Sequence, residues 1–209
     1  MGAMSRIAWF KTILFVACLA PALYLAWRWY NDDLGINRIE FVARYTGRWT
    51  LRLLIATLAI TPLRRLPRLN SLIRVRRMLG LFTFFYGLGH GLHYLAIDIQ
   101  WDWLTLQEDL TYRRFFIAGA IALTLMTPLA LTSFSAAIRW MGGRRWRLLH
   151  MLIYPAAISA SIHYLWQAKG LDMTPLKYAC VVWLLLIARV VLYGWKRWKK
   201  ARAPAVARA

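Results

Sequence analysis

Long apolar runs alternate with short polar stretches along the chain. Six runs of 17 to 21 residues each approach the roughly 20 residues that a helix needs to cross a hydrocarbon core. We therefore predict an all-α membrane protein, a bundle of six transmembrane helices at residues 13–29, 45–63, 78–97, 115–134, 146–166 and 175–195. Since no Gly/Ser-rich linker or long polar block divides the chain, residues 1–209 should form a single transmembrane domain.

The polar stretches differ in charge, and this difference predicts the orientation of the helices. The chain has a net charge of +20, yet residues 64–77 and 135–147 contain arginines and no acid, whereas the acids gather in the other loops. By the positive-inside rule, the basic loops and both termini should face the cytoplasm. Because the basic residues alternate with apolar spans, we expect them to contact lipid headgroups and not nucleic acid.

All four histidines lie inside predicted helices, where an ionisable side chain is costly and usually marks a site. His150 and His163 are thirteen residues apart, about 20 Å along a helix, so one should lie near each face of the membrane. In the predicted orientation, His90 and His163 lie at matching depth near the outer face. Neutral imidazoles so placed are typical of axial haem ligands. His93 is an alternative ligand on the same helix as His90.

The inner level has only one histidine, His150. Arg76 is fourteen residues before His90, on nearly the same helical face, where a second ligand is expected. A guanidinium stays protonated and is a poor iron ligand, so Arg76 should either pair with a haem propionate or cap the membrane interface. Three arginines on the second and sixth predicted helices either reach the membrane surface or pair with a propionate: Arg48, Arg52 and Arg189.

The spacing of the two histidines in the fifth predicted helix poses a geometric problem. Thirteen residues place His150 and His163 about 140° apart on an ideal helix. Pro155 lies between them and cannot donate a backbone hydrogen bond, so a kink or π-bulge could turn the second half of the helix.

Three segments, GRWTLRLLIATLAITPLRR, IRVRRMLGLFTFFYGLGH and WRLLHMLIYPAAISASIHYLW, resemble in order and spacing the MsrQ (YedZ) family. These are haem-binding membrane subunits of bacterial periplasmic methionine sulfoxide reductase systems, in the ferric reductase-like group, and the resemblance covers nearly the whole chain. It implies a multi-pass protein of the bacterial inner membrane with one or two haem b groups and FMN. Electrons would come from the quinone pool or a cytosolic flavin reductase.

The resemblance also implies a partner. The acceptor would be MsrP, the periplasmic molybdopterin subunit that reduces methionine sulfoxide in oxidised periplasmic proteins. The family's haem ligands carry over to His90, His150 and His163, whereas His93 is a difference that leaves the ligand on the third helix open.

The residues outside the helices limit the chemistry of the chain. About fourteen residues follow the sixth predicted helix, and no Gly-rich strand–helix signature is present, so we expect no flavin or nicotinamide domain. The outer loops lack a triad, a thiolate nucleophile and paired carboxylates. We therefore expect an electron-transfer subunit of an oxidoreductase, without a substrate-reducing site of its own. The alternatives are a cytochrome b anchor of another oxidoreductase and a haem-free transporter whose histidines move protons or ions.

Overall fold

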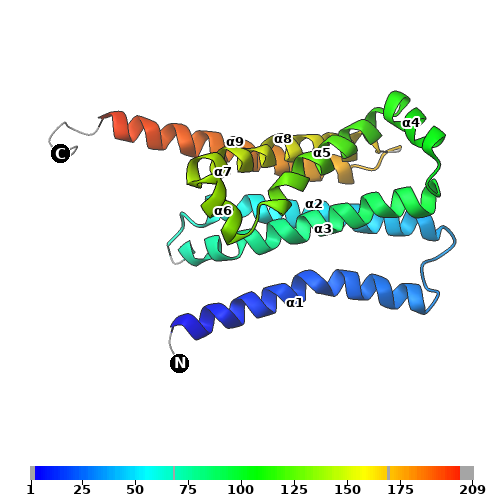
Figure 1. Cartoon of the computed structure of the whole chain (residues 1–209), viewed down its shortest axis with the longest axis horizontal. Coiled ribbons are helices and arrows are strands. Elements are labelled where there is room, and N and C mark those ends of the chain that lie inside the picture. Colours follow the sequence, from blue (N-terminus) through cyan, green and yellow to red (C-terminus); the bar gives the residue numbers. More distant parts are fainter. Residues whose placement is uncertain (1–2, 68, 169, 203–209) are drawn as a thin grey trace.

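The computed structural model describes residues 3–67, 69–168 and 170–202, and the regular structure within them is helical. Long helices run side by side along one axis (Figure 1). They are α1 (Ala3–Tyr30), α2 (Arg38–Leu63), α3 (Arg76–His93), α5 (Arg114–Leu131), α7 (Gly143–Leu149) with α8 (Ile153–Trp166), and α9 (Thr174–Arg202). Shorter elements join them: η1 (Asn70–Arg74), a π-helical turn η2 (Tyr94–Asp98), α4 (Trp103–Tyr112), α6 (Ser135–Met141) and a 3-10 turn η3 (His150–Leu152).

Every apolar run of the sequence forms one of the long helices. Within the described residues, α1, α5, α7 with α8, and α9 are long and apolar enough to cross a membrane. The less apolar α2 and α3 bury threonines, among them Thr50, Thr57 and Thr83. Each of these hydroxyls donates to a carbonyl one turn earlier in its own helix, at 2.8–2.9 Å. Such local bonds satisfy the hydroxyl and allow a threonine to face an apolar interior.

Two helix ends differ from the prediction because of local polar side chains. α2 begins at Arg38, seven residues before the predicted start, since Asn37 Oδ1 accepts from the Glu40 amide at 3.0 Å and caps the helix. α5 ends at Leu131 and not at residue 134. There the hydroxyls of Thr132 and Ser133 donate to the carbonyls of Pro128 and Leu129, both at 2.6 Å.

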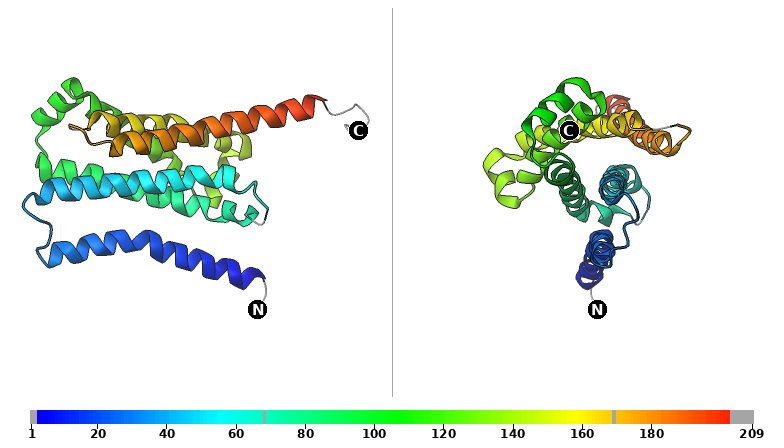
Figure 2. Two further views of the ribbon diagram at one scale, coloured as in Figure 1. Left: turned by 180° about the vertical axis from the view of Figure 1, so that it is seen from behind. Right: turned by 90° about the vertical axis from the view of Figure 1, so that its right-hand side faces the viewer.

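The core lies among α2, α3, α5, α8 and α9, and α1 lies at the periphery (Figure 2). Leu54 and Leu58 of α2 pack with Ala157 of α8 and Val182 of α9, all of them fully buried. α1 attaches through its own backbone. The Tyr86 hydroxyl donates to the Cys18 carbonyl at 2.9 Å, and the Tyr45 hydroxyl donates to the Pro21 carbonyl at 3.1 Å.

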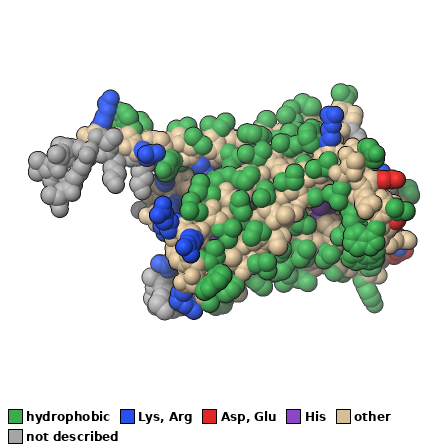
Figure 3. Space-filling model, turned by 45° about the horizontal axis from the view of Figure 1, so that its top comes forward, with side chains coloured by type: hydrophobic (Ala, Val, Ile, Leu, Met, Phe, Trp, Pro, Cys, Tyr) green, Lys and Arg blue, Asp and Glu red, His purple; other side chains and the backbone are tan. Residues whose placement is uncertain are grey.

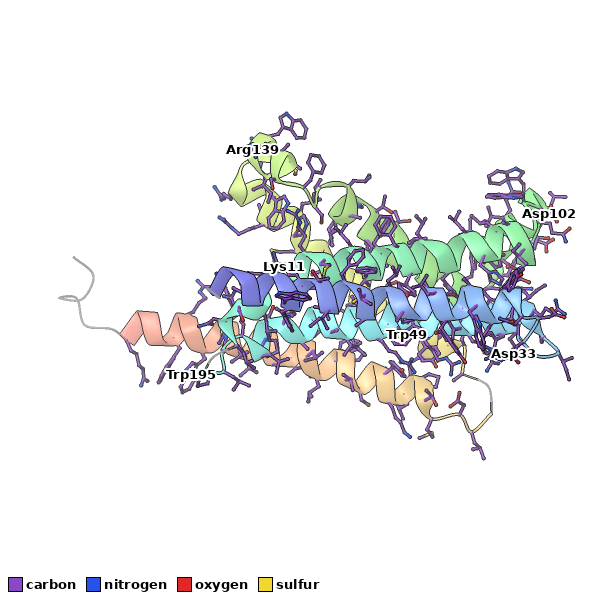
Figure 4. All side chains as sticks on the ribbon, turned by 90° about the horizontal axis from the view of Figure 1, so that it is seen from below. Lys11, Asp33, Trp49, Asp102, Arg139 and Trp195 are labelled. Atoms are coloured by element: carbon purple, nitrogen blue, oxygen red, sulfur yellow. The ribbon has the colours of Figure 1, made fainter. Side chains whose placement is uncertain are left out.

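Basic and acidic side chains gather at opposite ends of the bundle (Figure 3). Asp33 and Asp102 lie at one end, and Arg139 and Trp195 lie toward the other (Figure 4). α1 begins and α9 ends at the basic end (Figure 1). The separation of charge on which the predicted orientation depends is therefore present in the folded chain.

At the acidic end, α4 was not predicted, because its ten residues are too few to span a membrane and half of them are polar. Its first turn is capped by Asp102, and the hydrogen bonds from Thr105 and the Leu104 amide hold the pKa of this carboxyl below its usual value. Its last turn carries Asp109, which is 2% exposed. Asp109 accepts from the Tyr94 hydroxyl and pairs with Arg113 at 2.9 Å, so it ties α4 to the π-helical turn that follows α3.

Candidate functional site

His90 of α3 and His163 of α8 face one another inside the bundle. Their ring centres are 6.1 Å apart, and their planes are inclined by 75°. Two imidazoles that ligate one metal from opposite sides have ring centres about 6 Å apart, because each metal–nitrogen bond is about 2 Å long. The two residues predicted to lie at one depth are thus brought together at a separation that suits axial ligation.

A hydrogen bond at Nδ1 of each ring leaves Nε2 free to bind a metal. His163 Nδ1 donates to the Phe115 carbonyl of α5 at 2.7 Å. His90 Nδ1 is 3.3 Å from Thr46 Oγ1 of α2, and that hydroxyl donates to the Val42 carbonyl, so it accepts from the imidazole. Both rings then carry the proton on Nδ1 and a lone pair on Nε2, the form in which a histidine binds metal.

The protein alone does not complete a metal site around these rings. Among the described residues, no group of three or more His, Cys, Asp and Glu side chains could hold a metal ion. Two imidazoles that ligate one octahedral metal supply two of its six coordination positions and leave four for a cofactor. A porphyrin, which supplies four nitrogens in a plane, fits this pair of ligands.

Two glycines make room for the rings, and the sequence reasoning missed both. A Cβ on Gly119 of α5 would lie 2.7 Å from His163 Nδ1, and a Cβ on Gly47 of α2 would lie 3.3 Å from His90 Cε1. A side chain at position 119 would force the His163 ring to shift, and one at position 47 would make an unusually tight contact with the His90 ring. Both glycines lie on helices adjacent to the histidines, so only the packing of the helices reveals them.

Two of the glycines beside His90 in the sequence lie against α5. A Cβ on Gly87 would lie 3.3 Å from Met126, and a Cβ on Gly91 would lie 3.0 Å from Leu123. These two glycines therefore allow α3 and α5 to pack closely.

His93 does not join the pair. Its Nε2 lies 3.0 Å from the Ile39 carbonyl in the first turn of α2. The Nε2–H that this hydrogen bond requires leaves no lone pair on that nitrogen. In this arrangement the His93 ring links α3 to α2.

A second candidate site lies toward the basic end. A cavity of about 730 Å³ opens between α2, α3, α5, α7 and α8, and both His150 and Arg76 line it. Its walls are mainly apolar, with three further arginines, and the volume is within the range of cofactor pockets. The cavity is also lined by Arg77, Arg144, Trp146, Arg147 and Tyr154.

His150 has a nitrogen available for a ligand in this cavity. Its Nδ1 lies 3.1 Å from the Trp146 carbonyl, and its ring stacks on the Trp146 ring with centres 3.8 Å apart. The Nε2 atom is buried and has no hydrogen-bond partner among the residues that the structure describes. Since buried polar atoms nearly always have partners, this nitrogen fits a ligand or a metal that completes the site.

The helix that carries both His150 and His163 changes its winding between them. The sequence left open a kink or π-bulge at Pro155, and the structure has a 3-10 turn at His150–Leu152. Each residue of a 3-10 helix advances about 120° where an α-helix advances about 100°, so three residues add about 60°. The turn therefore reduces the angle around the helix axis between the side chains of His150 and His163.

The four arginines predicted as propionate or inner-site contacts have different surroundings. Arg76 lies in the cavity with His150. Arg48 Nε donates to the Arg44 carbonyl at 3.2 Å. Arg52 Nε donates to the Tyr178 hydroxyl of α9 at 2.9 Å. Arg189 of α9 is 7% exposed, and its Nη2 donates to the Leu58 carbonyl of α2 at 2.6 Å.

Comparison with known proteins gives consistent matches. Residues 46–161 match the family described as ferric reductase like transmembrane component. A protein of Ralstonia nicotianae, named protein-methionine-sulfoxide reductase heme-binding subunit MsrQ, is 45% identical over 94% of this chain and 90% of its own length. Proteins of the same name from Polaromonas naphthalenivorans and Azospira oryzae are 43% and 47% identical, over 92% and 87% of this chain and 87% and 78% of their own lengths.

Proposed function

Because this chain belongs to the MsrQ family of haem-binding subunits and to the ferric reductase-like transmembrane proteins, we propose that it conducts electrons across the bacterial inner membrane. The donor is the quinone pool or a cytosolic flavin reductase. The acceptor is MsrP, the periplasmic molybdopterin subunit that reduces methionine sulfoxide in oxidised proteins. The observation that carries the proposal is the pair of imidazoles, His90 and His163, with ring centres 6.1 Å apart.

The proposed topology has six membrane-spanning helices and both termini in the cytoplasm. The basic end of the bundle then faces the cytoplasm, and the acidic end, with α4, faces the periplasm. In α2 and α3 the hydroxyls of the buried threonines donate hydrogen bonds to carbonyls of their own helices. Polar groups at membrane depth need such partners within the protein. The His90–His163 pair then lies on the periplasmic side, near the acceptor.

The outer site holds haem b, which supplies reversible one-electron chemistry when bound. His90 and His163 would hold it through their imidazole rings. Thr46 and the Phe115 carbonyl fix the tautomer and the rotation of the two rings. Gly47 and Gly119 let the rings sit close to α2 and α5.

The cavity at the basic end holds a second centre, either a haem with His150 as its protein ligand or FMN. Its apolar walls suit a flat ring system, and Arg76 with Arg77, Arg144 and Arg147 suits the propionates or the phosphate. Thirteen residues, about 20 Å of helix, separate the levels of His150 and His163, so an intermediate centre is needed for fast transfer.

Gly119→Ala is expected to disturb the outer site. The added methyl group would lie 2.7 Å from His163 Nδ1, so the ring must move away from the Phe115 carbonyl. Overpacking of this kind costs about 1–3 kcal/mol. A lower melting temperature and an altered low-spin haem spectrum are the expected readouts. Gly89→Ala on α3 is the matched control, because nothing lies within 4 Å of its Cβ. Equal spectra for wild type and Gly119→Ala would contradict this packing.

Reconstitution with the partner tests the function. The purified protein is reduced in lipid vesicles, and reoxidation of the haem is followed with MsrP and a methionine sulfoxide peptide. We expect fast reoxidation that requires both. Matched reactions omit MsrP or replace the peptide with its methionine form. Reoxidation at the same slow rate in every reaction would refute MsrP as the acceptor and favour a cytochrome b anchor for another oxidoreductase.

A further inference from the structure

Arg189 of α9 is a buried cation whose charge is not matched by any ion pair in the described residues. Its side chain is 7% exposed, and both Nε and Nη1 are buried without a hydrogen-bond partner. A guanidinium that merely reaches the membrane surface keeps its head exposed, which this one does not. Burial of an unpaired charge is expensive, so its presence requires an explanation.

A structural role accounts for one of its hydrogen bonds. Pro62 lies within α2 and has no N–H, so it leaves the carbonyl of Leu58, one turn earlier, without its helical partner. Arg189 Nη2 donates to this carbonyl at 2.6 Å. A neutral amide could do the same. The positive charge and the two unpartnered donors therefore remain unexplained by the packing.

The surroundings of Arg189 place this charge beside the inner cavity. Its guanidinium carbon lies 5.5 Å from the ring centre of Tyr154, which lines the cavity with His150 and Arg76. Arg76 lies near enough for the two like charges to repel one another. Since charges act strongly through an apolar interior, two unpaired arginines make the cavity a region of positive potential.

A positive potential favours whichever state of a neighbouring centre carries more negative charge. Reduction by one electron from the donor adds one negative charge in the cavity. We propose that Arg189 acts on the electron relay through its charge, which raises the reduction potential of the inner centre. This inference rests on the proposed function, because it requires a redox centre in the cavity with His150.

Redox titration of the purified, cofactor-loaded protein tests the proposal. Arg189→Gln removes the charge and keeps an amide that can reach the Leu58 carbonyl. We expect the midpoint potential of the inner centre to fall by at least about 59 mV, which is tenfold in the equilibrium constant of a one-electron couple. The centre at His90–His163 should keep its potential. Arg189→Lys retains the charge, so its inner centre should keep a midpoint potential close to that of the wild type. Arg139→Gln, on the exposed surface of α6 (Figure 4), is the control with the same loss of charge.

The outcomes separate the inference from the function. An unchanged midpoint potential of the inner centre in Arg189→Gln would overturn the inference but not the proposed relay. An equal fall in Arg139→Gln would have the same consequence. A wild-type protein that titrates as a single centre would overturn the relay and the inference together. Arg189→Met provides a second neutral variant, since it fills similar space without any polar group, and it should show the same fall in potential.

Discussion

His163→Ala is expected to abolish the low-spin haem spectrum of this protein. The substitution removes one of the two imidazoles that face each other across 6.1 Å, and the neighbouring Phe115 and Gly119 of α5 offer no ligand in its place. Loss of an outer-shell partner alone typically costs about 10–100-fold in metal affinity, so loss of an axial ligand should cost more. His90→Ala should have the same effect from the other side.

Haem content and the Soret band of the purified variants provide the measurement. His93→Ala is the matched control, because His93 lies on the same helix and contacts the Ile39 carbonyl at 3.0 Å. It should keep both the haem and the low-spin band. A wild-type spectrum for His163→Ala would remove His163 as a ligand, and a loss of the band in His93→Ala but not in His90→Ala would reassign the ligand on α3.

His150→Ala is expected to slow reduction by the donor while it leaves the outer site intact. The substitution removes the one histidine of the inner cavity, whose Nε2 is buried without a partner. Electrons would then have to bridge about 20 Å of helix without an intermediate centre. We expect the rate of reduction to fall at least about tenfold. This is the lower end of the loss that follows when a residue that supports a metal ligand is removed.

Stopped-flow measurement of each half-reaction separates the two steps. Reoxidation of the pre-reduced outer haem by MsrP should proceed at the wild-type rate in His150→Ala, since His90 and His163 are unchanged. If His150→Ala were reduced at the normal rate and failed only in passing electrons outward, the direction assigned to the relay would be wrong.

Much of the fold follows from the apolar pattern, because each apolar run of the sequence forms one of the long helices. The elements that were missed depend on polar side chains instead. α4 has no apolar run and is held by Asp102 at its start and by Asp109 near its end. The early start of α2 depends on the cap at Asn37. Such contacts decide where a helix begins or ends, and hydrophobicity carries no signal for them.

The sequence predicts how far along its helix each histidine of the candidate site lies, but not the direction in which its side chain points around the helix axis. Depth in the membrane follows from residue number, so His90 and His163 could be matched from the sequence. Rotation depends on packing and on local winding. The proximity of Gly47 and Gly119 to the rings, and the 3-10 turn that starts at His150, therefore became visible only in the folded chain. The burial of Arg189 beside Tyr154 has the same origin.

If His90 and His163 hold one haem between them, exogenous imidazole should replace the missing side chain in His163→Gly. The variant is purified with ¹⁵N-labelled imidazole, and pulsed EPR detects labelled nitrogen bound to the iron. We predict that the low-spin signal is lost without imidazole, returns with it, and carries the label, while the wild type takes up none. A low-spin signal that persists in His163→Gly without imidazole, or that returns without the label, would contradict the claim.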